Sequence, residues 1–373
     1  MRILHVHSGN IFGGVERIHL ALAAHKNYSP QIEHVFALCF PGRLSEELAA
    51  TGAEVHFLPP FRLSRPWELF GARAALYRLL RAGAFDLAVV YSTWSHVSFA
   101  PTLARAGLPL LFWLVTRHTG KSFLDRWAQL RSPDRIVAMS AHSNQTAPLL
   151  FPNVPSRVAF TPLTFDSRAF DPGKRPQIRE SLCASADSVV ILQCSRLEAW
   201  KGHAPLLEAL GLLAANPKWS CWIAGGAQGP DELAYLESLK KMAAENSISE
   251  RVQFLGERND VGALMTAADI YCQPNLEPEG FGVIFMEAAY AARSIVTSAT
   301  GGALEILDQS SGILLPPRDV PALAKALERL IENQRLRDDL GAAARERVLK
   351  LCDPARCFRE LEDIFSETIA AHG

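Results

Sequence analysis

Residues 189–202 read VVILQCSRLEAWKG, an apolar run followed by a short polar loop that ends in glycine. The run is typical of a buried strand in a parallel sheet, which helices cover on both faces. An amphipathic helical pattern follows at residues 204–215. In doubly wound α/β domains, ligands bind in the loops that follow the carboxyl ends of the strands. The stretch therefore predicts a strand–helix unit with a ligand-binding loop, in which Arg196 and Lys201 are the cationic candidates.

The same alternation of strand and helix patterns runs through the whole chain. Amphipathic helical patterns separate short apolar runs, for example at residues 68–82, 231–245 and 320–333. This alternation predicts an α/β protein with parallel sheets. The strands expected before the midpoint are residues 2–7, 33–38, 54–58, 86–91, 110–115 and 135–140, and those after it are 188–194, 220–224, 251–255, 269–273, 294–297 and 312–315. Two sets of about six strands favour two Rossmann-like domains over one eight-stranded barrel.

A stretch poor in periodicity divides the two sets of strands. Residues 161–176 read TPLTFDSRAFDPGKRP, rich in proline, aspartate and glycine, which is typical of a linker. The length of 373 residues also exceeds the size at which one core usually stops growing. We therefore expect domains at residues 1–165 and 166–354, followed by a final helix at residues 355–373.

The composition is that of an ordinary soluble protein, with 49% apolar and 21% charged residues. The most apolar run, residues 108–115, is far shorter than the roughly 20 residues of a membrane-spanning helix. The N-terminus MRILHVHSGN alternates like a first strand and does not resemble a signal peptide. The seven cysteines are scattered without a CxxC pair, so we expect buried thiols in a reducing, cytoplasmic compartment and no zinc site.

Charge is divided unevenly between the two halves. Residues 1–165 carry 16 Lys+Arg against 9 Asp+Glu, a balance of +7, and the remainder carries 22 against 30, a balance of −8. The basic half predicts contact with a membrane surface or a phosphorylated acceptor, unless one face of a soluble protein simply carries more arginine. No nucleic acid partner is expected. The stretch 61–83, with five arginines against Glu68, is a candidate for peripheral docking at the inner face of a membrane, or else a solvated helix face.

Arg196 and Lys201 are expected to face a ligand from one loop, beside the N-terminus of a helix. Two fixed cations next to helix amides are suited to a diphosphate. Basic residues are also common in loops that bind nothing, so this pattern by itself leaves both interpretations open.

A second loop-and-helix segment, residues 275–287 with the sequence NLEPEGFGVIFME, contains two carboxylates of interest, Glu279 and Glu287. Glu279 falls on the loop, and Glu287 falls two turns into an apolar helix. A carboxylate in such surroundings is usually paired or hydrogen-bonded, and vicinal sugar hydroxyls are suitable donors. Gly280 and Gly282 permit close backbone approach, and amides at the helix start can bind phosphate. The alternative is a structural ion pair between Glu287 and a neighbouring Lys or Arg.

Three blocks together resemble the retaining glycosyltransferases of family four, which have the GT-B fold. The blocks are SRLEAWKG at 195–202, VQFLGERND at 252–260 and ADIYCQPNLEPEGFGVIFMEAAYAARSIVTSATGGALEIL at 268–307. Their order and spacing match over about residues 190–315, and the architecture matches over the whole chain. The resemblance implies two Rossmann-like domains facing a cleft. Residues 1–165 would bind the acceptor, residues 166–354 the nucleotide sugar, and the helix at 355–373 would pack toward the N-terminal domain.

The resemblance also implies roles for individual residues of the C-terminal half. Arg196 and Lys201 would neutralise the donor diphosphate, Glu279 would contact the donor sugar and Glu287 the ribose hydroxyls. The base would lie against residues 254–258. The backbone amides near sugar and phosphate would be those of Phe281, Gly282 and Val283, and a further loop lining the donor side contains Gly301, Gly302 and Glu305.

In the N-terminal half the likeness to the family is weaker. The loop GNIFGGVER, which contains Gly13 and Gly14, would close over the donor phosphates and help to shape the acceptor site. His118 would hydrogen-bond the transferred sugar, and Ser140 would line the cleft. Two departures from the common pattern are Asn275, where serine is frequent, and a divergent linker after Asn153.

Family resemblance further implies transfer of a hexose from a UDP- or GDP-linked sugar to a saccharide, lipid-linked or polysaccharide-precursor acceptor. Cations and helix amides would stabilise the leaving group without a metal or other cofactor. The leaving phosphate would help to deprotonate the acceptor, so no side chain would be a covalent nucleophile. The alternatives are a nucleotide-sugar 2-epimerase of the same architecture and a non-catalytic nucleotide-sugar-binding subunit. A Rossmann dehydrogenase is disfavoured, because no GxGxxG opens a helix after any strand.

Overall fold

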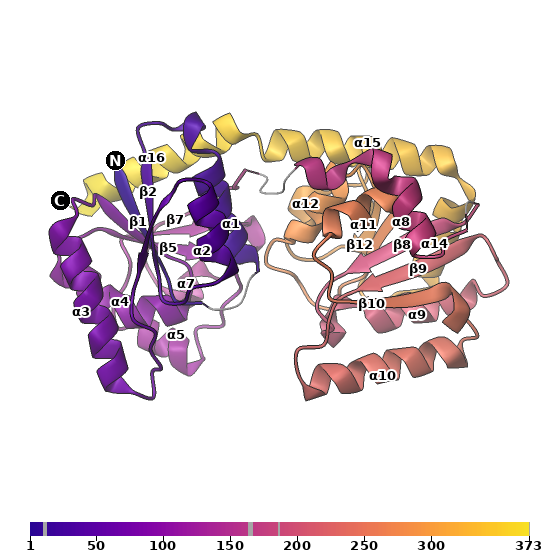
Figure 1. Cartoon of the computed structure of the whole chain (residues 1–373), viewed down its shortest axis with the longest axis horizontal. Helices are drawn as coiled ribbons and strands as arrows, with labels where there is room; N and C mark the ends of the chain where they lie inside the picture. Colours follow the sequence, from indigo (N-terminus) through magenta and orange to yellow (C-terminus); the bar gives the residue numbers. More distant parts are fainter. Residues whose placement is uncertain (10–12, 163–166, 186, 373) are drawn as a thin grey trace. The chain divides into compact units, whose positions relative to one another are not determined.

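The computed structural model describes residues 1–9, 13–162, 167–185 and 187–372 of the chain. It divides into two compact units (Figure 1). The N-terminal unit comprises Met1–Thr164 and Cys352–Gly373, and the C-terminal unit comprises Phe165–Leu351. The last helix, α16 (Pro354–His372), therefore belongs to the N-terminal unit, where it contacts strand β4 (Leu87–Val90).

The N-terminal unit is built on a seven-stranded sheet in the order β3-β2-β1-β4-β5-β6-β7, in which all neighbours are parallel. Its other strands are β1 (Arg2–His7), β2 (Glu33–Leu38), β3 (Glu54–Phe57), β5 (Leu110–Leu114), β6 (Arg135–Ala138) and β7 (Ser156–Val158). Its other α-helices are α1 (Gly14–Ala24), α2 (Arg43–Ala50), α3 (Pro66–Ala82), α4 (Thr93–Arg105), α5 (Phe123–Ala128), α6 (Ala141–Asn144) and α7 (Ala147–Leu150). Strand β7 was not expected from the sequence, because this three-residue edge strand is only partly buried and lacks an apolar run.

The C-terminal unit holds a six-stranded parallel sheet in the order β10-β9-β8-β11-β12-β13. Its strands are β8 (Val189–Cys194), β9 (Trp219–Ala224), β10 (Val252–Gly256), β11 (Ile270–Gln273), β12 (Ser294–Ser298) and β13 (Ile313–Leu315). The α-helices are α8 (Arg175–Ser181), α9 (His203–Leu212), α10 (Pro230–Glu245), α11 (Val261–Ala267), α12 (Val283–Tyr290), α13 (Ala303–Ile306), α14 (Val320–Glu332) and α15 (Gln334–Leu351). The α/β fold class with two Rossmann-like domains is confirmed.

Helices lie on both faces of each sheet (Figure 1), and the strands are correspondingly apolar on both faces. All five residues of β5 are buried, as are the first five of β8. This burial explains why continuous apolar runs, rather than alternating ones, marked the strands in the sequence.

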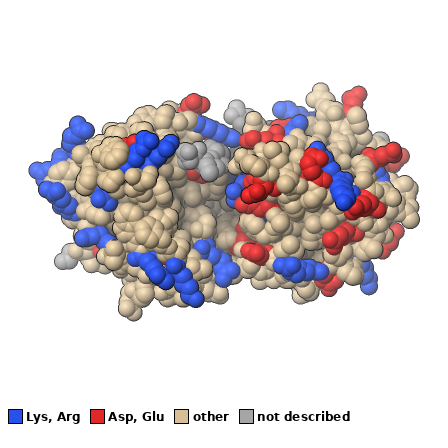
Figure 2. Space-filling model, turned by 90° about the horizontal axis from the view of Figure 1, so that it is seen from below, with Lys and Arg blue, Asp and Glu red and all other residues tan. Residues whose placement is uncertain are grey.

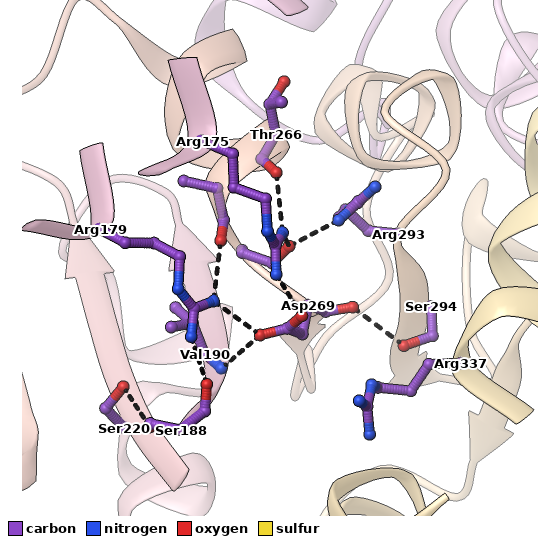
Figure 3. A network of polar contacts seen from close by, with 12 residues as sticks. Arg175, Arg179, Ser188, Val190, Ser220, Thr266, Asp269, Arg293, Ser294 and Arg337 are labelled. Carbon is purple, nitrogen blue, oxygen red and sulfur yellow. Dashed lines mark hydrogen bonds and ion pairs between the residues drawn. The ribbon is translucent and has the colours of Figure 1, made fainter. Parts of the chain in front are cut away.

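A partly buried carboxylate joins helix α8 to the sheet of the C-terminal unit (Figure 3). Asp269, just before β11, accepts hydrogen bonds from Arg175 Nη2 at 2.6 Å, Arg179 Nη1 at 3.0 Å and the Val190 amide at 2.8 Å. Burial by itself raises the pKa of Asp269, but Arg175, Arg179 and the Val190 amide outweigh it and lower the pKa below its usual value. The ionised Asp269 thus holds α8, the first α-helix of this unit, against the sheet.

Charge differs between the surfaces of the two units. On the face drawn in Figure 2, blue Lys and Arg side chains are spread over the N-terminal unit and red Asp and Glu side chains gather on the C-terminal unit. None of the described helices is long and apolar enough to cross a membrane.

Candidate functional site

The loop after β8 carries the first pair of predicted site residues. Lys201 ends a short 3-10 helix, Ala199–Lys201, and is buried, whereas the Arg196 side chain is 57% exposed and lies 3.1 Å from Glu198. Gly202 has φ +80°, and a Cβ there would lie 2.0 Å from the Pro274 carbonyl oxygen. Only glycine fits this approach, which brings the loop after β8 against the loop after β11.

Lys201 and Glu279 meet where these two loops adjoin. The Lys201 Nζ donates to Glu279 Oε1 at 2.6 Å and lies 4.1 Å from the centroid of the Trp200 ring. The Leu276 amide donates to the Trp200 carbonyl at 2.7 Å, which ties the loops together. Two residues that the sequence placed 78 positions apart therefore form one ion pair.

Two amide side chains complete the environment of Glu279. Gln273 Nε2 and Asn275 Nδ2 donate to Glu279 Oε2 at 3.2 Å and 3.1 Å. The Tyr271 hydroxyl donates to Gln273 Oε1 at 2.7 Å, and burial raises the pKa of Tyr271 well above its usual value, so the phenol keeps its proton. All three residues are buried, and the carboxylate is held in one orientation by donors on both oxygens.

The sequence analysis did not identify Gln273 and Tyr271 as members of the site, and it treated Asn275 only as a departure from a family pattern. A signal was present, because polar side chains in a strand buried on both faces need partners. The strand IYCQ at 270–273 is such a case. The hydrogen-bond partners of these side chains depend on which loop folds over the end of the strand, and the sequence does not show which loop that is.

Glu287 lies on α12, the helix that follows the Glu279 loop, and is buried. Gly282 caps this helix with φ +92°. The Phe285 amide donates to the Gly282 carbonyl at 2.9 Å. The amides of Val283 and Ile284 stand at the very start of the helix, the position from which helix amides can bind an anion. A second glycine-containing loop supports this segment: the Gly302 amide donates to the Glu279 carbonyl at 2.9 Å, and a Cβ on Gly301 would lie 2.4 Å from that same oxygen.

His203 is a further buried residue of this region. Burial, and then the charge of Lys201, lower the pKa of His203 to about 4, so the ring is neutral at pH 7. Its Nε2 lies within hydrogen-bond distance of Ser195 Oγ, at 3.1 Å. The cations of this site are therefore Arg196 and Lys201, and His203 adds none.

In the N-terminal unit, His118 follows β5 and is held by a buried carboxylate. Its Nδ1 donates to Asp125 Oδ1 at 2.9 Å, and the Gly120 amide donates to Asp125 Oδ2 at 3.0 Å. Burial by itself raises the pKa of Asp125, but His118, Ser122 and Gly120 outweigh it and lower the pKa below its usual value. With Nδ1 as the donor, Nε2 of the neutral ring is the acceptor. The sequence analysis missed Asp125, which lies seven residues from His118 on α5.

The remaining predicted residues of this unit have local structural partners. The Gly13 amide donates to Glu16 Oε2 at 2.7 Å, and Glu16 Oε1 lies 2.7 Å from His7 Nε2. Gly14 begins α1, and residues 10–12 of the same loop lie outside the described part of the chain. Ser140 is buried and its Oγ caps α6 by accepting from the Ser143 amide at 2.9 Å.

A cavity of about 630 Å³ opens at the carboxyl ends of β1 to β4 in the N-terminal unit. The Phe61 and Trp94 rings stack within its wall, with centroids 6.3 Å apart. Arg62 lines it too, and its backbone amide donates to Glu68 Oε2 at 3.0 Å. The other lining residues are Ser8, Gly9, Phe40, Pro60, Glu68 and Ser92. The sequence analysis did not name this cavity, because its walls come from four separate loops.

Within the described residues, no group of three or more His, Cys, Asp or Glu side chains is placed to hold a metal ion.

Residues 174–347 match the family described as glycosyl transferases group 1. A GDP-mannose-dependent monoacylated alpha-(1-6)-phosphatidylinositol monomannoside mannosyltransferase of Corynebacterium glutamicum is 30% identical over 210 residues, 53% of this chain and 51% of the relative. A D-inositol 3-phosphate glycosyltransferase of Saccharomonospora viridis is 28% identical over 64% of this chain and 56% of the relative. The chain thus spans about half the length of the curated relatives it matches.

Solved structures resemble the chain over nearly its whole length. Anabaena Alr3699/HepE, in complex with UDP and glucose, has a TM-score of 0.85 and 22% identity, and covers 98% of this chain and 100% of its own. WaaG, a glycosyltransferase involved in lipopolysaccharide biosynthesis, has a TM-score of 0.71 and 17% identity over 98% of this chain and 99% of its own. At these identities the likeness shows the fold, and the expected GT-B architecture is confirmed.

Proposed function

Because residues 174–347 of this chain match the glycosyl transferases group 1 family, we propose that it is a retaining hexosyltransferase. The donor is a UDP- or GDP-linked sugar, and the acceptor is a saccharide, a lipid-linked sugar or a polysaccharide precursor. The observation that carries the proposal is the ion pair between Lys201 and Glu279 beside the N-terminus of α12. It brings a cation for phosphate, a carboxylate for sugar hydroxyls and the first amides of a helix to one edge of the sheet.

Stabilisation of the nucleoside diphosphate leaving group is the main chemical requirement of the reaction. Lys201 donates one of its three N–H groups to Glu279, which leaves two for phosphate oxygens. Arg196 is exposed beside it, so it can turn toward the ligand. Preorganised cations and amides of this kind lower the barrier without a metal ion, and we propose metal-independent transfer.

In this proposal Glu279 orients the donor sugar and does not attack it as a nucleophile. Its two oxygens accept from Lys201, Gln273 and Asn275, so the carboxylate is already fixed before any sugar binds. A carboxylate with this many donors is a weak nucleophile and a good acceptor for sugar hydroxyls. Glu287, buried on α12, is assigned to the ribose hydroxyls.

His118 is assigned to the transferred sugar through Nε2. Asp125 holds Nδ1 and thereby selects the tautomer in which Nε2 accepts a hydrogen bond from a sugar hydroxyl. Gly13 and Gly14 are assigned to the loop that closes over the phosphates.

We assign the acceptor to the cavity lined by Phe61, Arg62 and Trp94. It lies outside the carboxyl ends of parallel strands, where doubly wound domains bind ligands. The names of the first relatives include phosphatidylinositol monomannoside and inositol 3-phosphate, which carry a phosphate that Arg62 can bind.

Helix α3, next to this cavity in the chain, is assigned to peripheral membrane contact. Trp67 and Phe70 are 69% and 66% exposed, and Arg65 and Arg78 are exposed on the same helix or at its start. Exposed aromatic rings beside arginines are suited to the interface of an anionic bilayer. Contact between α3 and the membrane would bring the protein to a lipid-linked acceptor.

The test is product analysis with UDP- and GDP-sugars and a panel of phosphorylated and lipid-linked acceptors. Transfer releases the nucleoside diphosphate and yields a glycoside with the anomeric configuration of the donor. A new nucleotide sugar formed without acceptor would identify a 2-epimerase, and donor binding without turnover would identify a binding subunit. Inversion at the anomeric carbon would contradict the retaining assignment.

A further inference from the structure

A second cavity, of about 530 Å³, lies at the other edge of the C-terminal sheet. It lies among the amino ends of β11 and β12, at Asp269 and Arg293, whereas the proposed donor residues follow the carboxyl ends of the strands. None of its lining residues belongs to the proposed donor site. Its volume falls within the range of small-molecule sites, about 300–1,000 Å³.

Arginines dominate the charged wall of this cavity. Four arginines and two aspartates line it: Arg175, Arg293, Arg337, Arg345, Asp269 and Asp338. Asp269 is already bonded to Arg175, and to Arg179 behind the wall, as Figure 3 shows. The lining groups therefore leave an excess of two positive charges.

For three of these arginines the described residues provide no carboxylate within 4.0 Å, although Asp269 and Asp338 are near enough to Arg293 to interact with its charge. Arg293 donates to the Ala268 and Ala291 carbonyls at 2.7 Å and 2.8 Å, and Arg337 donates through Nη1 to the Leu330 and Ile331 carbonyls. These carbonyls belong to helix ends, so part of each guanidinium has a structural role. Each guanidinium has five N–H groups, and the others remain for a ligand.

No described backbone carbonyl accepts a hydrogen bond from Arg345. It is exposed on α15, and the contact that the structure gives it is with Tyr290, whose ring centroid lies 5.2 Å from its Cζ. Tyr290 packs edge-on against Phe170 at 5.1 Å, and both rings line the cavity. The wall of the cavity therefore combines aromatic rings with guanidinium groups.

The electrostatics of the charged wall favour an anion. Burial, and then the charge of Arg175, lower the pKa of Arg293 to about 10, while Asp269 and Asp338 oppose this only in part. A bound anion would relieve the repulsion between these guanidiniums. Arginine binds carboxylate and phosphate through two parallel N–H bonds, and a phosphate has enough oxygens to accept from several guanidiniums at once.

We propose that this cavity binds a small phosphate ester, with Arg293, Arg337 and Arg345 around the phosphate and Phe170 and Tyr290 against the organic part. The proposal is independent of the glycosyltransferase assignment, since it uses no residue of the donor site. It gives the C-terminal unit a second ligand site at the opposite edge of its sheet.

Isothermal titration calorimetry at low ionic strength tests the site. The probes are glucose 6-phosphate and glycerol 3-phosphate, with glucose and inorganic phosphate as comparisons. Arg345→Gln is the main variant, because Arg345 supports no backbone carbonyl, and Arg337→Gln is the second. Arg335→Gln is the matched control, since Arg335 lies on the same helix, is 91% exposed and does not line the cavity.

We expect one phosphate ester per chain, affinity reduced at least about tenfold in Arg345→Gln and Arg337→Gln, and unchanged affinity in Arg335→Gln. Binding of neither ester to the wild type, or equal binding to wild type and Arg345→Gln, would overturn the proposal. Inorganic phosphate that binds as well as both esters would reduce the site to an adventitious ion only. UDP titrated into the same variants reports on the donor site separately, so failure of one assignment is distinguishable from failure of the other.

Discussion

The Nζ atom of Lys201 lies 2.6 Å from Oε1 of Glu279, and both side chains are largely buried. Neither charge would be stable alone in this position, because each is removed from water and relies on the other. A donor that enters the site therefore meets a pair that is already neutral, and its diphosphate must share the ammonium with Glu279. This explains why two residues from different loops are expected to act as one unit.

Replacing Lys201 by Ala is expected to lower kcat/KM by about 10²–10³-fold, the scale found when one preorganised charge-stabilising donor is removed. The measurement is steady-state kinetics with the best donor and acceptor from the panel. Lys240→Ala, an exposed lysine paired with Glu237 on α10, is the matched control and should retain full activity. Turnover at the wild-type rate in Lys201→Ala would show that the phosphate assignment is wrong.

Replacing Glu279 by Gln keeps the shape of the side chain and removes its charge. Because Glu279 is proposed to act by position, we expect kcat to fall by about 10²-fold, while circular dichroism shows the wild-type fold. The double variant Lys201→Ala/Glu279→Gln should be far less impaired than the product of the two single effects, since residues in contact are not additive. Strict additivity would contradict the shared role of the pair.

Asp125→Asn is expected to lower kcat by about 10–100-fold with little change in donor KM, by analogy with carboxylates that orient metal-binding histidines. The physical reason is the His118 tautomer, since an amide can accept from Nδ1 or donate to it and no longer selects one form. Kinetics over a pH series separates this effect from simple unfolding. Asp134→Asn, at a partly exposed aspartate of the same unit, is the comparison.

Asp269→Asn is expected to destabilise the C-terminal unit by about 3 kcal/mol, because Arg175 and Arg179 lose their shared counter-ion. The measurement is urea unfolding at pH 7. The control is Asp339→Asn on α15, whose pair with Arg335 is highly exposed and spans 3.7 Å. That pair should contribute less than about 1 kcal/mol.

Acid should remove the contribution of ionised Asp269 to the free energy of unfolding of the wild type. The pKa of Asp269 is lowered in the folded chain from 3.8, so its unfolded form binds protons more readily and stability is lost as pH falls. The contribution is complete above pH 3.8 and disappears as pH passes below the folded pKa. Unfolding free energies measured from pH 6 downward should therefore fall less steeply for Asp269→Asn than for wild type.

Membrane contact through α3 is expected to depend on its two exposed aromatic rings. Trp67→Ser/Phe70→Ser should weaken sedimentation with vesicles rich in anionic lipid at least about tenfold, because both rings lose apolar burial at the interface. Leu233→Ser on α10, 55% exposed in the other unit, is the control. Equal sedimentation of the aromatic double variant and wild type would remove α3 from the docking surface.

Much of the architecture followed from the order of residues, because buried parallel strands leave continuous apolar runs that can be read without a structure. Six strands of each sheet were expected in this way, and the exception, β7, is short and partly exposed. The loops that carry Lys201 and Glu279 were also identified, since strand ends and glycines mark them.

The partners of those residues were decided by the tertiary structure. Lys201 pairs with Glu279, which is 78 positions away in the sequence, and His118 pairs with Asp125 on the next helix. The arginine-lined cavity is formed by residues between 170 and 345. The amino-acid sequence by itself determined which segments are strands, helices and loops, because these follow from local periodicity and backbone preference. Which side chains share a charge, a hydrogen bond or a cavity wall was settled only when sheet order brought distant strand ends together.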